Sequence, residues 1–235
     1  MAEGLRIEGL TAGYAGIAAV RDVSLTVAPG EVVALLGPNG AGKSTTLLSA
    51  IGALAPMGGR VLFDGQDITG RTPDAVSRLG LALVPDSRGI FFDLTVRDHF
   101  RLAAPKGDKA AVEAMLDRFG ALRGLMDRRA GLLSGGEQQM LALAKAFVTK
   151  PSVLMVDEMS LGLAPLIVQS LMPIMRRAAE EEGMGILLVE QHIEMALKVA
   201  DRGIVLNRGA VRFEGPAREL LTNRADVEAS YMARA

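Results

Sequence analysis

The stretch GPNGAGKST at residues 37–45 decides the fold class of this chain, and it directly follows the apolar run VVALL at residues 32–36. It contains the pattern G-x-x-x-x-G-K-[ST], whose fixed positions are Gly37, Gly42, Lys43 and Ser44. In such a loop the backbone N–H groups turn inward around phosphate oxygens, and the N-terminus of the next helix faces the same anion. The stretch therefore predicts a phosphate-binding loop between a buried strand and a helix.

Each part of this loop has an expected role. Lys43 supplies a positive charge to the β- and γ-phosphate oxygens, and the Ser44 hydroxyl lies where Mg²⁺ binds. The other residues expected to contact the nucleotide are Gly37, Pro38, Asn39, Gly40, Ala41, Gly42 and Thr45. A chance glycine turn is the alternative, but a chance turn has no reason to follow a strand and open a helix.

Strand-like runs alternate with helical stretches along the rest of the chain. Continuous apolar runs, typical of strands buried on both faces of a parallel sheet, lie at residues 32–36, 81–84, 153–156 and 186–189. Alternating runs, typical of half-buried antiparallel strands, lie at residues 5–8 and 23–27. Helices are expected at residues 43–51, 137–148, 165–182, 193–200 and 217–221. We predict an α/β, P-loop NTPase core with a mostly parallel sheet and an N-terminal antiparallel β portion.

One region departs from this alternation. Residues 91–133 contain helical stretches such as 110–119 and no convincing strand, so we expect an inserted helical subdomain within a single domain spanning residues 1–235. Pro173 lies inside an otherwise helical pattern, where it is expected to kink or break the helix.

Composition excludes several classes of protein. A net charge of -1 argues against a broad nucleic-acid-binding surface. With no cysteine, and with His99 and His192 as the two histidines, a Cys- or His-based metal site is not expected. The start of the chain lacks a secretory pattern, and no apolar run approaches the ~20 residues that cross a bilayer. We therefore expect a cytoplasmic protein whose membrane role, if it has one, comes through a partner.

Two carboxylates follow the apolar run at residues 153–156. Asp157 and Glu158 lie at the C-terminal end of a predicted buried strand, beside the phosphate-binding loop. Asp157 is expected to hold the water shell of Mg²⁺, and Glu158 to polarise the attacking water as general base. Acidic residues in this place are often only a helix cap, but the upstream loop favours the catalytic interpretation.

The stretch LSGGEQQM at residues 133–140 forms a second small turn that leads into a helix. Backbone N–H groups of Gly135 and Gly136, with the Ser134 hydroxyl, are suited to contact a γ-phosphate. Ser134 with Glu137 three residues on also reads as a capping box, and the two interpretations are compatible.

These motifs together resemble the ATP-binding cassette (ABC) ATPases, in which the LSGGEQQ signature of one subunit completes the ATP site of another. The spans VALLGPNGAGKSTTL, LALVPDSRGIFFDLTV, LSGGEQQMLALAKAF, SLGLAP and ILLVEQ look like the ATPase subunits of branched-chain amino acid importers, and ATPases of urea or amide importers are similar. The resemblance covers nearly the whole chain. It implies a second ATPase subunit in a homodimer or heterodimer, transmembrane permease subunits, a solute-binding protein reached through them, and a place on the inner face of the membrane.

The resemblance also assigns Tyr14, which lies upstream of the phosphate-binding loop where this family stacks an aromatic residue on adenine. A core or turn residue is the alternative. Phe91 and Phe92 lie where ABC importers receive a helix of the membrane subunit. An exposed pair would anchor that interface, and a buried pair would belong to the core.

Three residues depart from the family pattern. Asp86 stands where a glutamine usually touches Mg²⁺, Gln191 stands where a switch histidine usually grips the γ-phosphate, and Met159 replaces a proline. Adjacent residues at a strand end point in different directions, so we do not transfer the switch role to His192, although a shift of one residue stays open. We therefore hypothesise that this chain hydrolyses ATP slowly at its own loop, and that its intact signature completes a faster site on a partner.

Three rival functions remain open at this stage. A soluble ABC ATPase of translation or DNA repair usually carries two cassettes or a long inserted coil, and this sequence shows neither. A P-loop kinase or GTPase has no need of LSGGEQQ. A pure binding module has no need of the general base that Glu158 supplies.

Overall fold

A computed structural model describes residues 3–104 and 108–232. Its central sheet has six strands in the order β10-β9-β3-β8-β7-β6. β3 pairs in parallel with β8 and β9, β7 pairs in parallel with β6 and β8, and β10 is antiparallel at the edge. The strand bounds are β3 Val32–Leu36, β6 Leu81–Val84, β7 Val153–Asp157, β8 Gly185–Glu190, β9 Arg202–Asn207 and β10 Ala210–Pro216. The carboxyl ends of the parallel strands therefore meet at one edge of the sheet.

A second sheet is antiparallel throughout, with the order β2-β1-β4-β5. Its strands are β1 Leu5–Tyr14, β2 Ile17–Val27, β4 Gly58–Phe63 and β5 Gln66–Asp67. The predicted N-terminal antiparallel portion is thus confirmed, and it is larger than expected because β4 and β5 join the two strands foreseen at residues 5–8 and 23–27.

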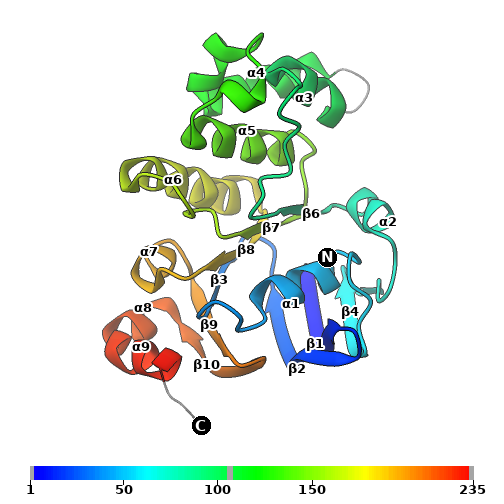
Figure 1. The fold of residues 1–235 in the computed structure, drawn as a ribbon, viewed down its shortest axis with the longest axis vertical. Coiled ribbons are helices and arrows are strands. Elements are labelled where there is room, and N and C mark those ends of the chain that lie inside the picture. The colour runs from blue at the N-terminus through cyan, green and yellow to red at the C-terminus, as the bar shows by residue number, and fades with distance from the viewer. Residues whose placement is uncertain (1–2, 105–107, 233–235) are drawn as a thin grey trace.

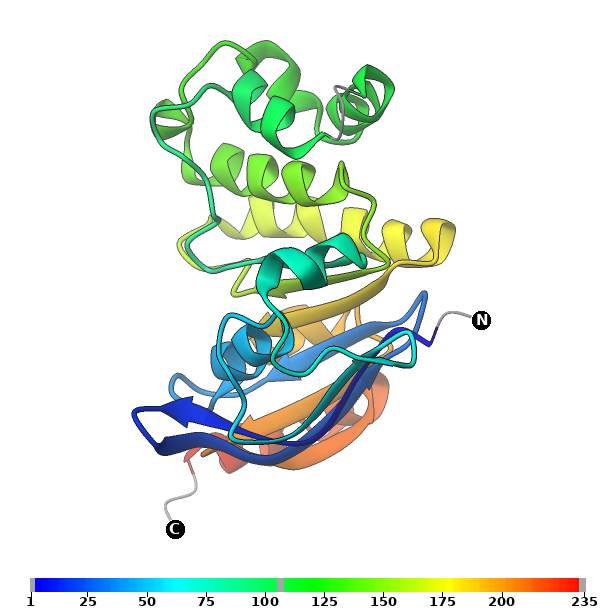
Figure 2. The ribbon, with the colours of Figure 1, turned by 90° about the vertical axis from the view of Figure 1, so that its right-hand side faces the viewer.

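Most of the helices lie around the central sheet (Figure 1). α5 and α6 lie along one face of the central sheet, with α3 and α4 beyond α5, while α1 lies on the side of the antiparallel sheet (Figure 2). The α-helix bounds are α1 Lys43–Ala50, α2 Pro73–Arg78, α3 Val96–Ala103, α4 Lys109–Arg118, α5 Gly135–Phe147, α6 Pro165–Glu182, α7 Ile193–Leu197, α8 Ala217–Thr222 and α9 Arg224–Met232. Two 3-10 helices are η2 Gly120–Leu125 and η3 Ala130–Leu132.

β3 shows why the continuous apolar runs form this sheet. Its side chains alternate between two hydrophobic clusters, because successive residues of a strand point to opposite faces. Val32, Ala34 and Leu36 pack in the cluster that contains α5 and α6. Val33 and Leu35 pack in the cluster shared with the antiparallel sheet and α1. A strand that is buried on both faces must be apolar at every position, as the sequence is here.

The helical stretch around residues 91–133 folds into α3, α4, η2 and η3. An isolated β-bridge between Thr95 and Arg129 closes its base. Of the predicted kink or break at Pro173, the break does not occur, because α6 continues from Pro165 to Glu182. Pro173 lies on the exposed side of α6, where water can satisfy the carbonyl that loses its partner.

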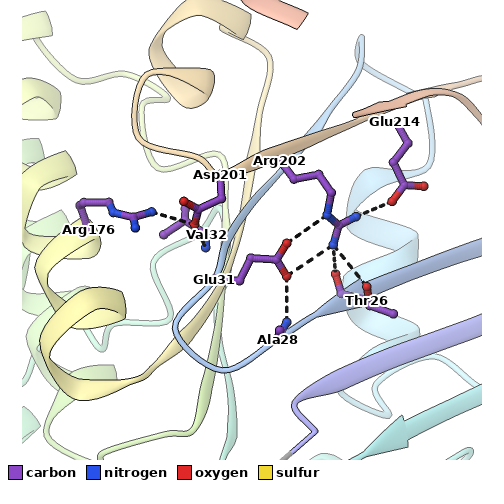
Figure 3. Close-up of polar contacts among 8 residues, drawn as sticks. All are labelled: Thr26, Ala28, Glu31, Val32, Arg176, Asp201, Arg202 and Glu214. Carbon is purple, nitrogen blue, oxygen red and sulfur yellow. Dashed lines mark hydrogen bonds and ion pairs between the residues drawn. The ribbon is translucent and has the colours of Figure 1, made fainter. Parts of the chain in front are cut away.

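Arg202 connects the two sheets through polar contacts (Figure 3). This residue begins β9, and its guanidinium donates to Glu31 Oε1 at 3.0 Å and to the Thr26 carbonyl at 2.7 Å. It also forms an ion pair with Glu214 of β10. Burial of the guanidinium opposes its charged form, but the hydrogen bond and charge of Glu31 hold the pKa of Arg202 above its ordinary value. These contacts fix the start of β3 relative to β2 and β9.

Candidate functional site

The phosphate-binding loop joins β3 to α1, as its sequence predicts. Lys43 is 4% exposed, and its Nζ donates hydrogen bonds to the carbonyls of Gly37 at 2.9 Å and Pro38 at 3.1 Å. The ammonium group is therefore held at the mouth of the loop. Gly42 has φ of +102°, and a Cβ there would lie 2.3 Å from Val20 Cγ1. This position requires glycine both for its conformation and for its space.

Glu158 lies directly after β7 and beside this lysine. Its Oε1 is 3.5 Å from Lys43 Nζ, and its backbone N–H donates to the Val189 carbonyl at 2.9 Å. Its φ of +47° is unusual for a residue with a side chain. The structure thus holds Glu158 in a strained conformation that directs its carboxylate toward the phosphate-binding loop, and backbone strain of this kind is often found at functional sites.

Asp157 ends β7 and is the most unusual polar group of the site. Its Oδ1 is buried and has no hydrogen-bond partner among the described residues. Burial raises the pKa of Asp157, the nearby carboxylates Asp86 and Glu158 raise it further, and the Ser44 hydroxyl and Lys43 oppose the change. A buried carboxylate oxygen without a donor, beside a serine hydroxyl, has the chemistry of a site for a hard cation. The described part of the chain contains no group of three His, Cys, Asp or Glu side chains arranged around a metal.

Gln191 follows β8, and its side chain reaches Glu158. Its Nε2 donates to Glu158 Oε1 at 2.8 Å. His192, one residue later, is exposed and stands at the N-cap of α7. The structure therefore brings Gln191 rather than His192 into contact with Glu158.

The signature turn, residues 134–136, lies at the N-terminus of α5. Ser134 accepts from the Glu137 N–H at 3.3 Å, and Glu137 accepts from the Ser134 N–H at 2.7 Å, so the capping box is present. Ser134 remains exposed, while Gly136 is buried. A Cβ on Gly136 would lie 3.0 Å from Ile167 Cγ2 of α6, which explains a small residue at this position. A capped helix end with an exposed hydroxyl is compatible with anion binding.

Tyr14 and Asp86 both have exposed side chains. Tyr14 ends β1 and is 54% exposed, so its ring is free to stack on a planar group and the core alternative is excluded. Asp86 is exposed beyond β6, and its Oδ1 accepts from the Ser87 N–H at 2.7 Å. Its charge acts on Asp157 through space.

Phe91 and Phe92 are 61% and 59% exposed, which excludes the alternative that they are core residues. The Phe91 N–H donates to Nε2 of the fully buried His99 at 2.9 Å, and His99 Nδ1 lies 2.8 Å from the Thr95 carbonyl. His99 therefore holds the backbone that presents the two aromatic rings. A pocket of about 520 Å³ adjoins them and is also lined by Leu102.

One pair of residues near the site was not foreseen from the sequence. Glu190, the last residue of β8, is 1% exposed and accepts two hydrogen bonds from Ser160. Both residues lie in stretches that the resemblance singled out, ILLVEQ and SLGLAP, but nothing in either stretch indicates that they contact each other.

A buried lysine in a glycine loop after β3, with two acidic residues at the end of β7 in the same sheet, defines a nucleoside-triphosphatase of the P-loop class. The solved structures with this fold are ATP-binding cassettes. An ATP-binding cassette of an ABC transporter in its ADP conformation is 25% identical, with complete coverage of both chains and a TM-score of 0.87. An ATP-binding subunit of an ABC transporter is 28% identical, with 97% and 99% coverage and a TM-score of 0.84.

The chain belongs to the ABC transporter ATPase family, since the family described as ABC transporter matches residues 20–160. The branched-chain amino acid transport ATP-binding protein BraG of Pseudomonas aeruginosa is 38% identical, over 93% of this chain and 95% of that protein. The probable branched-chain amino acid transport protein LivF of Archaeoglobus fulgidus is 39% identical, over 92% and 94%. The lipopolysaccharide export protein LptB of Escherichia coli is 31% identical, over 92% of each. The chain is thus an ATPase whose hydrolysis of ATP is coupled to transport. Among the described residues, none of the helices combines the length and apolarity that a membrane span requires.

Proposed function

We propose that this chain is the ATPase subunit of an importer of branched-chain amino acids or related small solutes. The observation that supports the proposal is its 38–39% identity to two branched-chain amino acid transport proteins over more than nine-tenths of each chain. The export protein LptB, at 31%, is less similar. The stretches SLGLAP and ILLVEQ point to the same branch of the family.

In the proposed reaction, Lys43 and the loop N–H groups bind the β- and γ-phosphates of ATP. Glu158 accepts a proton from the attacking water, and Gln191 orients the Glu158 carboxylate through their hydrogen bond. Tyr14 stacks on adenine.

Mg²⁺ is the cation that fits the unpartnered Asp157 oxygen. Ser44 and Asp157 would hold it, and the nearby charge of Asp86 would add to its attraction. Such an ion supplies positive charge to the phosphate oxygens when it is bound. The chain's own contribution is the placement of a buried carboxylate and a hydroxyl on one side of the phosphate-binding loop.

The proposed assembly is a dimer of ATPase subunits on the inner face of the membrane. ATP bound at Lys43 of one subunit also contacts the signature serine of the other, so ATP favours the closed dimer and hydrolysis releases it. Transmembrane permease subunits dock at the exposed pair Phe91 and Phe92, and a solute-binding protein acts through the permease. Residues 91–133 form the helical subdomain that carries the signature into this dimer.

Uptake measurements in the source cell test this proposal. The gene is deleted and restored as wild type or as Glu158→Gln, and uptake of radiolabelled leucine, urea and acetamide is measured. We expect leucine uptake to be lost on deletion and restored only by the wild type. Loss of urea or acetamide uptake with leucine unaffected would assign the chain to the related amide importers. Unchanged uptake of all three solutes, together with a defect in translation or DNA repair, would favour a soluble ABC ATPase.

A further inference from the structure

The end of β8 holds the segment that follows β7 through three consecutive residues. The Val189 carbonyl accepts from the Glu158 N–H at 2.9 Å, and the Gln191 side chain donates to Glu158 Oε1 at 2.8 Å. Between them, Glu190 accepts from Ser160. Its Oε1 is 2.9 Å from the Ser160 N and its Oε2 is 2.6 Å from the Ser160 Oγ.

The Glu190 carboxylate is unusual because it is almost completely buried and both its oxygens contact one residue. A buried carboxylate is costly unless it is well hydrogen-bonded, and burial raises the pKa of Glu190 while the Ser160 contacts lower it. Since both oxygens are occupied, this group is not free to take a proton from a water at the phosphate-binding loop. The Glu190 carboxylate instead links the end of β8 to Ser160 through two hydrogen bonds.

Ser160 begins a short loop, residues 160–164, that leads to α6. The Leu163 N–H donates to the Ser160 carbonyl at 3.1 Å, which closes the loop into a turn. This turn packs against the signature. A Cβ built on Gly135 would lie 3.4 Å from Leu163 Cδ2 and 3.8 Å from the Gly162 carbonyl oxygen. Moving Ser160 would therefore displace atoms that lie next to the signature turn.

We propose that Glu190 is a positioning residue which, by holding Ser160, couples the chain's own ATP site to its own signature turn. The path runs from Glu158 and Gln191, through Glu190 and Ser160, to Leu163 and Gly135. The inference rests on the proposed function, because in the proposed dimer the signature turn completes the site of the other subunit. By this route, ATP binding at the chain's own site would change the position of the signature turn that completes the ATP site of the other subunit.

The chain offers a direct readout of this coupling, since it has no native cysteine. Leu161 lies in this loop and Leu132 lies two residues before Ser134, and their side chains are 55% and 65% exposed. Spin labels attached at Leu161→Cys and Leu132→Cys report the distance between the 160–164 loop and the signature segment. The measurement uses full-length nucleotide-free protein, at a concentration where light scattering shows a monomer.

Three backgrounds distinguish the proposal from general destabilisation. Glu190→Ala removes both acceptors. Glu190→Gln retains a carbonyl for the Ser160 N–H and an amide that donates to the Ser160 Oγ. Glu31→Ala is the matched control, because it removes a carboxylate with two partners, Ala28 N and Arg202, far from the signature turn.

We expect the distance distribution to be narrow in the wild type, in Glu190→Gln and in Glu31→Ala, and to broaden in Glu190→Ala. We also expect Glu190→Ala to lower kcat about tenfold with little change in KM for ATP, since small misplacements at a site carry costs of this size. A distribution as narrow in Glu190→Ala as in the wild type would overturn the proposal. Equal broadening in Glu190→Gln would also overturn it, because charge rather than position would then be responsible.

Failure of the proposed function has a different result. If the wild type does not bind ATP in equilibrium dialysis, the assignment as an ATPase subunit fails. The distances between the spin labels in nucleotide-free protein still test whether Glu190 positions Ser160. If ATP binds and the distances do not respond to Glu190→Ala, only the coupling inference fails.

Discussion

Gln191 Nε2 donates a hydrogen bond to Glu158 Oε1 at 2.8 Å, and the same oxygen lies 3.5 Å from Lys43 Nζ. One carboxylate oxygen thus connects the phosphate-binding loop, the end of β7 and the residue after β8. Lys43 is also the residue proposed to bind the γ-phosphate, so a bound triphosphate would exchange this contact for contacts with the phosphate.

Glu158→Gln is expected to retain ATP binding and to lower kcat by ~10²–10⁴, the usual contribution of a general base. The amide keeps the size of the side chain but cannot accept the proton. Steady-state ATPase assays and equilibrium dialysis measure the two quantities separately. Lys43→Ala is the companion variant, and it should lose ATP binding itself. Turnover in Glu158→Gln equal to that of the wild type would exclude Glu158 as the base.

Gln191→His is expected to raise kcat, because an imidazole can contact the γ-phosphate in addition to Glu158. Asp86→Gln should add to this effect, since it removes a charge that acts on Asp157. ATPase assays compare kcat of the two single variants and the double variant with that of the wild type. Each variant is also made with Glu158→Gln, which shows whether the measured turnover depends on the general base of this site. Slower turnover in both single variants would contradict the hypothesis that this chain's own site is the slow one.

Asp157→Asn is expected to bind ATP in EDTA as well as the wild type, but to lose the gain in affinity that Mg²⁺ gives. The reason is that Oδ1 of Asp157 is buried without a donor and is free to serve a cation. Titration of ATP with and without Mg²⁺ measures this difference, which we expect to be about tenfold or 1.4 kcal/mol. The same Mg²⁺ dependence in the variant and the wild type would remove Asp157 from the cation site.

Phe92→Asp is expected to prevent assembly with the permease while leaving ATP binding intact, because the ring is 59% exposed. Phe213→Asp is the matched control, since Phe213 is also an exposed aromatic residue but lies on β10. Co-purification from the native membrane measures assembly, and dialysis measures ATP binding. Loss of ATP binding in Phe92→Asp would indicate a structural role instead.

Glu190→Gln is expected to change how stability depends on pH. Burial raises the pKa of Glu190 in the folded state above its ordinary value of 4.5. A raised folded-state pKa contributes stability that is fully present below pH 4.5 and is lost as pH rises through the folded-state pKa. The amide that replaces the carboxyl group does not titrate, so the variant does not lose this stability. The free energy of unfolding of the variant minus that of the wild type should therefore increase as pH rises from 4.5 to the folded-state pKa of Glu190, and should be constant above it. Urea denaturation at a series of pH values measures it. A difference that does not vary with pH would show that Glu190 titrates alike in both states.

Much of the fold follows from local pattern. The four runs at residues 32–36, 81–84, 153–156 and 186–189 are apolar at every position because both faces of their sheet are covered, and all four are strands of the central sheet. β9 and β10 were not predicted, since β9 begins with Arg202, and β10 contains Arg212 and Glu214 and has no buried residue. Pro173 does not break α6, because a helix with a well-packed inner face tolerates proline on its outer face.

The sequence by itself determined the phosphate-binding loop, the acidic pair after β7 and the signature turn. Each is a contiguous motif whose chemistry depends on neighbours in the chain. Only the tertiary structure decided that Gln191 rather than His192 contacts Glu158, that Phe91 and Phe92 are exposed, and that Glu190 holds Ser160. These relationships join residues 30 or more positions apart, or depend on what covers a surface. Sheet pairing and packing set such distances, and no local pattern of residues records them.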